Sequence, residues 1–186
     1  VAKAAMDSGV ASRPIEDLEA YKHRLDGSVF KSALLMRPVF EAARTASRRI
    51  VFAEGEDERV LRASQAVLEE TTETPILIGR PEVIESRAER LGLSIRPGQD
   101  VQIVNPENDP RYRDYWTSYH RIMERQGVTP DLAKAILRTN TTAIGGIMVH
   151  RGEADSLICG TFGEYRWHLN YVQQILGGGS YAPHGA

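Results

Sequence analysis

The stretch CGTFGEYRWHLNYVQQI, residues 159–175, combines residue types that could bind a negatively charged group. A short apolar run ends at Cys159, Gly160 follows, and a helical pattern begins a few residues later. A strand, a glycine turn and a helix N-terminus often bind anions, because free backbone N–H groups and the helix dipole both favour negative charge. The pattern is compatible with chemistry on an acyl or phosphoryl group, and equally with binding alone.

A second group of candidate residues is a run of acids that follows another short apolar segment, Glu54, Glu56, Asp57 and Glu58. Acids at a helix N-terminus complement the helix dipole, and we favour this interpretation over a metal site, for which no histidine is nearby. The histidines do not have zinc-site spacing, and the glycines match neither a dinucleotide fingerprint nor a P-loop. The sequence therefore predicts no bound metal and no resident cofactor in this chain.

Two further signals are interpreted as structural. Cys159 lies in an apolar run without a base partner, so we expect a small buried hydrophobic residue rather than a nucleophile. Aromatic and apolar residues at helical spacing predict a packed helix face rather than a base-stacking surface. The residues of this face are Tyr112, Tyr115, Trp116, Tyr119, Ile122 and Met123.

Composition narrows the classes of protein. The chain has 186 residues, 41% hydrophobic and 26% charged, which is enough for one substantial folded domain. A net charge of −2 gives no signal for nucleic acid or an anionic membrane. The single cysteine permits no internal disulfide and fits a cytoplasmic protein, and no apolar run is long enough to span a membrane.

Around these candidate residues, short strand-like runs alternate with helical patterns. Strands are predicted within 49–55, 74–80, 100–106 and 154–160, and helices over 31–46, 57–70, 81–93, 111–127 and 164–176. One long helix is predicted over 129–152, with Thr129 as its N-cap. The alternation predicts an α/β fold, three-layer αβα, with a mostly parallel sheet and helices on both faces, although it does not predict strand order.

Several stretches resemble one known group of proteins, in order along the chain. These stretches are VAKAAMDSGVASRPI, MRPVFEAARTASRRIVFAEGEDERVLRA, PILIGRPEVI, DPRYRDYW and GEADSLICGTFGEYRWHL. They are similar to the phosphate acetyltransferase-like domain of bacterial multidomain NADP-dependent malic enzymes and to the junction that precedes it. The resemblance covers nearly the whole chain.

The resemblance implies a domain organisation. Residues 1–30 would be a helical linker from the malic enzyme catalytic part, and residues 31–186 the first part of a phosphate acetyltransferase-like domain that is truncated before its end. The catalytic domain of the same parent chain would hold NADP and a divalent metal, Mg or Mn. The implied partners are further copies of the chain and acetyl-CoA, with no nucleic acid and no membrane.

The resemblance also implies which residues form a site. Arg138 matches an arginine that active acetyltransferases carry in the helix before the last strand. Their Ser/Thr-Thr-Ala-Asp sequence reads Glu164-Tyr165-Arg166-Trp167 here, and Asn170 replaces a second arginine. A neutral amide is a poor substitute for an arginine that binds phosphate. The implied role is binding of acetyl-CoA as an effector, without catalytic residues. From the residues themselves, Gly160 and Thr161 keep the anion-binding pattern, and Arg166 and His168 are further possible donors, although such helix side chains are more often solvated. The predicted effector-binding residues are therefore Arg138, Gly160, Thr161, Arg166, His168 and Asn170.

Three functions remain open at this point. The first is a regulatory and assembly domain of a malic enzyme that binds acetyl-CoA. The second is a working acetyltransferase, which Arg138 favours and which Trp167 and Asn170 disfavour. The third is an oligomerisation module without a ligand, since the aromatic helix could be either core or interface.

Overall fold

The computed structural model describes residues 6, 8, 9, 15, 17, 21, 31–46, 48–71 and 73–177. The chain divides into two compact units, Val1–Ala46 and Ser47–Ala186. In the first unit, helix α3 (Lys31–Thr45) continues through Pro38, which confirms the helix predicted there. Most of the predicted linker, and the glycine-rich segment after Gly177, lie outside the described residues.

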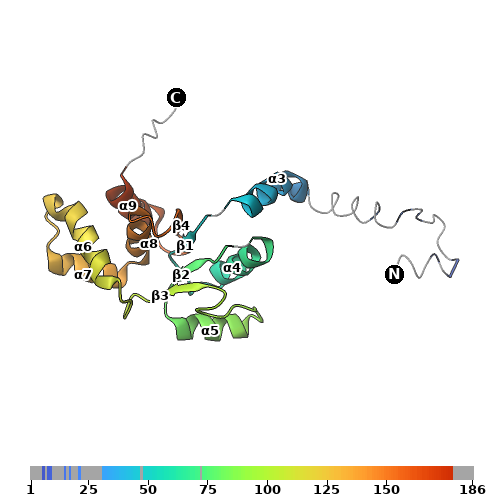
Figure 1. The fold of residues 1–186 in the computed structure, drawn as a ribbon, viewed down its shortest axis with the longest axis horizontal. Coiled ribbons are helices and arrows are strands. Elements are labelled where there is room, and N and C mark those ends of the chain that lie inside the picture. Colours follow the sequence, from blue (N-terminus) through green and yellow to red (C-terminus); the bar gives the residue numbers. More distant parts are fainter. Residues whose placement is uncertain are drawn as a thin grey trace, which may run out of the picture. The chain divides into compact units, whose positions relative to one another are not determined.

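The second unit contains a four-stranded parallel sheet (Figure 1). Its strands are β1 (Ile50–Phe52), β2 (Ile76–Ile78), β3 (Gln102–Val104) and β4 (Ser156–Ile158), in the order β3-β2-β1-β4. Val51 pairs with Ile76 on one side and with Leu157 on the other. All four strands fall within the segments predicted to contain them.

Helices cover both faces of this sheet, so the predicted three-layer arrangement is confirmed (Figure 1). One face packs against α4 (Glu58–Glu70) and α5 (Pro81–Arg90). The other face packs against a second group of helices. This group is α6 (Tyr112–Met123), α7 (Pro130–Thr139), α8 (Thr141–His150) and α9 (Tyr165–Leu176). The short η1 (Glu124–Gln126) follows α6 and has no buried residue. Among all the described helices, none is long and apolar enough to cross a membrane.

Alternation along the strands produces two separate cores. Successive strand side chains point to opposite faces, so Val51 joins the core under α6–α9 while Phe52 joins the core under α4 and α5. In β2, Ile76 and Ile78 lie in the first of these cores and Leu77 in the second. The sheet is therefore buried on both faces, as expected for parallel strands.

The aromatic face of α6 is part of the core, which confirms the structural interpretation. Tyr115, Tyr119 and Met123 are buried. The other three members of the face are partly buried and pack against the same cluster, namely Tyr112, Trp116 and Ile122.

The single helix predicted over 129–152 is wrong, because the chain breaks at Asn140 into α7 and α8. Asn140 has extended backbone angles, φ −122° and ψ 97°. Its own N–H donates to the carbonyl of Ile136 and ends α7, while its side-chain oxygen accepts the N–H of Ala143 and begins α8. An asparagine side chain competes with the helical hydrogen-bond pattern in this way, and helical periodicity on both sides conceals the break.

The strand order creates a switch point between β1 and β4. The chain runs from β1 to β2 to β3 in one direction, and then returns through α6–α8 to place β4 on the other side of β1. In open parallel sheets, ligands bind outside the carboxyl ends of the strands at such a point. The acidic run after β1 and the segment Cys159–Glu164 after β4, the β4–α9 loop, both lie there.

Candidate functional site

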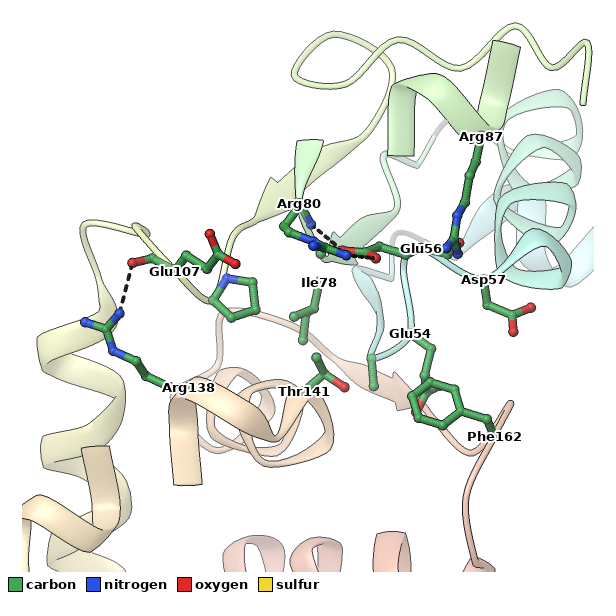
Figure 2. Close-up of a pocket in the computed structure, with 13 residues that line it drawn as sticks. Glu54, Glu56, Asp57, Ile78, Arg80, Arg87, Glu107, Arg138, Thr141 and Phe162 are labelled. Carbon is green, nitrogen blue, oxygen red and sulfur yellow. Dashed lines mark hydrogen bonds and ion pairs between the residues drawn. The ribbon is translucent and has the colours of Figure 1, made fainter. Parts of the chain in front are cut away.

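A cavity of about 400 Å³ opens at the carboxyl edge of the sheet (Figure 2). Each strand contributes to its walls through the residues that end it or follow it, and α5 and the ends of α7 and α8 contribute the rest. The lining residues are Ala53, Glu54, Glu56, Asp57, Ile78, Gly79, Arg80, Arg87, Pro106, Glu107, Arg138, Thr141 and Phe162. The cavity therefore has both apolar and charged groups in its lining, as is common for sites that bind small molecules.

Glu56 and Arg80 form an ion pair in this cavity that has three hydrogen bonds. Arg80 Nε and Nη2 each donate to one oxygen of Glu56 at 2.9 Å, and the Arg80 backbone N–H donates as well (Figure 2). These hydrogen bonds from Arg80 lower the pKa of the Glu56 carboxyl. Arg87 also donates to the Glu56 carbonyl, at 2.5 Å. Both guanidiniums are thus engaged within the protein.

Asp57 and Glu58 have the role in α4 that the sequence suggested. Asp57 is the N-cap of α4, where its side chain accepts the N–H of Arg59 at 2.8 Å, and Glu58 lies in the first turn. The guanidinium of Arg59 also donates to Asp57, and these contacts lower the pKa of the Asp57 carboxyl to about 2. The acids therefore serve the helix N-terminus, and no group of three or more possible metal ligands occurs among the described residues.

Glu54, the first acid of the run, has a different role. Its side chain is only 2% exposed, and both carboxylate oxygens accept the backbone N–H of Gly160 at 3.1 Å. Gly160 has a φ of +96°, a region that favours glycine. Glu54 therefore joins the end of β1 to the β4–α9 loop, directly across the switch point.

His168 lies beneath the same loop, with a side chain 5% exposed. Its Nε2 is 2.7 Å from the carbonyl oxygen of Phe162, and its Nδ1 is 2.8 Å from the hydroxyl of Thr142. Nδ1 is also 3.8 Å from a Glu54 oxygen. From the sequence, a histidine at this helix position is more often solvated, whereas the structure places His168 in the interior.

The other residues of the predicted effector site do not all converge. Arg138 lines the cavity, stacks over the ring of Tyr112 at 4.7 Å and donates weakly to the Glu107 carbonyl at 3.4 Å (Figure 2). Thr161 lies in the β4–α9 loop, and Arg166 is exposed on α9. Asn170 lines a different cavity, of about 350 Å³, between α6, α7 and α9.

Cys159 is half buried, directly after β4. Burial raises the pKa of its thiol, and the nearby Glu54 carboxylate raises it further. Both effects oppose thiolate formation, so the physical environment agrees with a structural cysteine rather than a nucleophile.

Sequence reasoning did not identify Glu54, Glu56 and Arg80 as residues of one cavity. A usable signal existed, because each of them follows the end of a strand and parallel strands end at the same edge of a sheet. The buried pairing of Glu54 with His168 had no comparable signal, since nothing in the local pattern links the two positions.

Comparisons with known proteins agree with this arrangement. The sequence profile of the family described as phosphate acetyl/butaryl transferase matches residues 34–182. The chain is 58% identical over 178 residues to an NAD-dependent malic enzyme of Rhizobium meliloti, and 52% identical over 177 residues to an NADP-dependent malic enzyme of Escherichia coli. Each match covers 95% of this chain and 23% of the relative, so the chain spans about a quarter of their length.

A solved structure provides the same assignment. A phosphotransacetylase from Staphylococcus aureus superposes with a TM-score of 0.66 and 26% sequence identity, covering 78% of this chain and 42% of that one. With the profile match over most of the chain, the parallel sheet and the cavity at its carboxyl edge, the chain belongs to the phosphate acetyl/butaryl transferase family and is homologous to the phosphate acetyltransferase-like region of bacterial malic enzymes.

Proposed function

We propose that this chain is a regulatory domain of a malic enzyme, and that its cavity binds acetyl-CoA as an effector without transferring the acetyl group. The observation that carries the proposal concerns two positions where active family members have arginine. The first position keeps its cation, because Arg138 lines the cavity. The second position has lost its cation, because Asn170 is a neutral amide, and it lines a different cavity.

The cavity suits an acyl-CoA better than a small reactive phosphate. Ala53, Ile78 and Phe162 supply apolar surface, while Arg138 supplies a cation on the side away from Phe162 (Figure 2). An acyl-CoA has an uncharged thioester and acyl group together with anionic phosphates, and it matches such a divided surface. A phosphoryl group that must react needs several fixed cationic groups at once, and Arg80 is already engaged by Glu56.

The parent activity belongs to the proposal as well. We infer that the longer polypeptide oxidises and decarboxylates malate to pyruvate in a separate catalytic domain, with a nicotinamide cofactor and a divalent metal. The relatives include proteins named for NAD and for NADP, so the choice between these cofactors belongs to that catalytic domain. The purified chain alone is expected to produce no NADPH from malate.

Isothermal titration calorimetry of acetyl-CoA, on the chain extended through the full domain, tests the effector role. Binding without production of acetyl phosphate supports the proposal. Turnover of acetyl-CoA and phosphate would assign the domain as an acetyltransferase instead, and absence of binding would favour a purely structural module. Free CoA is the matched ligand, because a thioester-dependent effector site should prefer the acetylated form.

We also infer self-association through the β4–α9 side of the second unit. Large apolar side chains are exposed there although the sheet is otherwise well covered, namely Ile158, Tyr165, Trp167 and Leu176. Exposed apolar patches of this kind mark interaction surfaces. Sedimentation velocity should show an oligomer, and a strictly monomeric profile at high protein concentration would contradict the inference.

A further inference from the structure

The β4–α9 loop is one wall of the cavity, yet its conformation depends on side chains buried beneath it. Phe162 lines the cavity, and 63% of this residue is exposed. Gly160 and Gly163 flank it with φ values of +96° and +88°, which side chains rarely tolerate. Two glycines give the loop little conformational preference of its own, so something else must select one conformation.

Three consecutive residues of the loop each have a backbone group bonded to a side chain from outside it. The N–H of Gly160 donates to Glu54, and the carbonyl of Phe162 accepts from His168. Between them, the carbonyl of Thr161 accepts a hydrogen bond from Arg59. Arg59 extends from the exposed start of α4, whereas Glu54 and His168 are interior.

The tautomer of His168 follows from its partners. A carbonyl oxygen only accepts, so Nε2 must carry a proton and donate to Phe162. Nδ1 then accepts from the Thr142 hydroxyl when the ring is neutral, and donates toward Thr142 or Glu54 when the ring is charged. The bond to Phe162 persists in both states, so the contact that holds the loop does not require a particular charge on the imidazole.

We propose that Glu54 and His168 are positioning residues, which hold the β4–α9 loop so that Phe162 forms the wall of the ligand cavity. Glu54 fixes the start of the loop and His168 fixes its middle, from the end of β1 and from α9. The two side chains touch each other beneath the loop, so displacement of either removes support from the other. In naming acetyl-CoA as the ligand, the proposal rests on the proposed function, but the positioning of the loop does not.

Two substitutions separate the hydrogen bonds of His168. The amide nitrogen of glutamine reaches about as far along the side chain as Nε2, so His168→Gln can still donate to the Phe162 carbonyl. The shorter amide of asparagine reaches about as far as Nδ1, so His168→Asn keeps the contact with Thr142 and loses the one with Phe162. Each variant loses one buried hydrogen bond, so a purely structural role would affect both alike.

Limited proteolysis with chymotrypsin, read by mass spectrometry, measures opening of the loop without any ligand. Cleavage after Phe162 requires the loop to leave its bonded conformation. We expect His168→Asn to be cleaved there at least about fivefold faster than wild type, and His168→Gln to stay within about twofold. Equal cleavage rates for the two variants would overturn the proposal.

Amide hydrogen exchange in the unmodified chain provides a test that needs no variant to fold. The Gly160 N–H should exchange at least about tenfold more slowly than a fully exposed amide, because it is bonded to a buried carboxylate. Exchange of Gly160 at the unprotected rate would overturn the role of Glu54.

Calorimetry with acetyl-CoA then links the loop to the ligand. His168→Asn should weaken binding about tenfold, with His168→Gln near wild type. If wild type binds no acetyl-CoA while His168→Asn still opens the loop, the proposed function fails and the positioning role stands. If wild type binds and the opened variant binds equally well, the role of the loop as a ligand wall is overturned.

Discussion

The backbone N–H of Gly160 donates to both carboxylate oxygens of Glu54 at 3.1 Å, across the switch point of the sheet. The donor that would have served a bound anion at this glycine turn is therefore already engaged by a carboxylate of the chain itself. An anionic ligand in the cavity must instead be attracted by side chains. Arg138 is the candidate, since Arg80 is paired with Glu56 and Arg87 donates to a backbone carbonyl at 2.5 Å. The carbonyl contact of Arg138 is long, at 3.4 Å.

The first prediction concerns Gly55, which allows the turn after β1 to approach β2. A Cβ on Gly55 would lie 2.8 Å from the Ile78 carbonyl oxygen and 2.8 Å from Leu77 Cβ. Backbone cannot easily move away, so Gly55→Ala should lower the free energy of unfolding by about 1–3 kcal/mol. Urea denaturation measures the loss.

Gly145 provides the matched control for Gly55. Its added Cβ would meet Leu157 Cδ1, the end of a flexible side chain that can rotate, and alanine favours helix α8 by about 1 kcal/mol. Gly145→Ala should therefore change stability by less than about 1 kcal/mol. Equal losses in the two variants would show that backbone crowding at Gly55 is not decisive.

The second prediction concerns acid stability through Asp57. Arg59 holds the pKa of this carboxyl near 2 instead of its ordinary 3.8. A carboxyl with a lowered folded-state pKa stabilises the protein above its unfolded pKa, and this contribution is lost as the pH falls through the folded value. Asp57→Asn, which can still cap α4, should flatten the dependence of stability on pH between about 4 and 2.

A second variant separates capping from charge at Asp57. Asp57→Ala removes the cap as well and should cost about 1 kcal/mol at neutral pH relative to the asparagine variant. Unfolding curves collected from pH 2 to 7 measure both effects. An unchanged slope in Asp57→Asn would mean that another carboxyl controls acid unfolding.

Much of the fold follows from local pattern, as β1 and α4 illustrate. The apolar run at Ile50–Phe52 and the acid-capped helical face that follows are both readable, because strand alternation and helix capping act over a few residues. Strand order is different in kind. It depends on which connection returns to the far side of β1, and that choice is determined by packing between distant segments.

The candidate site was predictable only where its chemistry is local. Gly160 and the following helix start were evident from the residues, and Arg138 followed from the resemblance. The burial of His168 was not, because its helical position gives no sign that its ring bonds to Thr142 on one side and to the Phe162 carbonyl on the other. Its partner Glu54 belongs to a run of acids in which Asp57 and Glu58 serve the start of α4, while Glu56 pairs with Arg80.

The third prediction concerns the break at Asn140. Its side chain caps α8 through the N–H of Ala143, and the residue is 3% exposed. Asn140→Ala should destabilise the protein by about 1 kcal/mol, whereas Asn140→Asp should keep most of the capping energy. Thermal unfolding provides the comparison. If alanine is tolerated as well as aspartate, the break between α7 and α8 is maintained by packing and not by the cap.

The fourth prediction concerns Tyr119 at high pH. Burial raises the pKa of its phenol to about 12, while its hydroxyl has only a long contact, 3.5 Å, with Gln174. A raised pKa means that stability is complete below the unfolded value near 10 and is lost as the pH rises toward 12. Tyr119→Phe should therefore unfold less steeply with pH over this range while keeping wild-type stability at pH 7, as followed by circular dichroism.

The last prediction tests the proposed effector site through Arg138, with Arg166 as its control. Both are exposed arginines of the predicted effector site, but of the two only Arg138 lines the cavity. In the full-length enzyme, Arg138→Ala should weaken the response of malate oxidation to acetyl-CoA by about 1–3 kcal/mol, the size of a hydrogen bond to a charged group. Turnover without effector should stay nearly unchanged, because the proposed function assigns malate oxidation to a separate catalytic domain. Arg166→Ala should respond to acetyl-CoA as wild type does. A wild-type response in Arg138→Ala would place the effector elsewhere, and an equal loss in both variants would indicate general surface charge rather than this cavity.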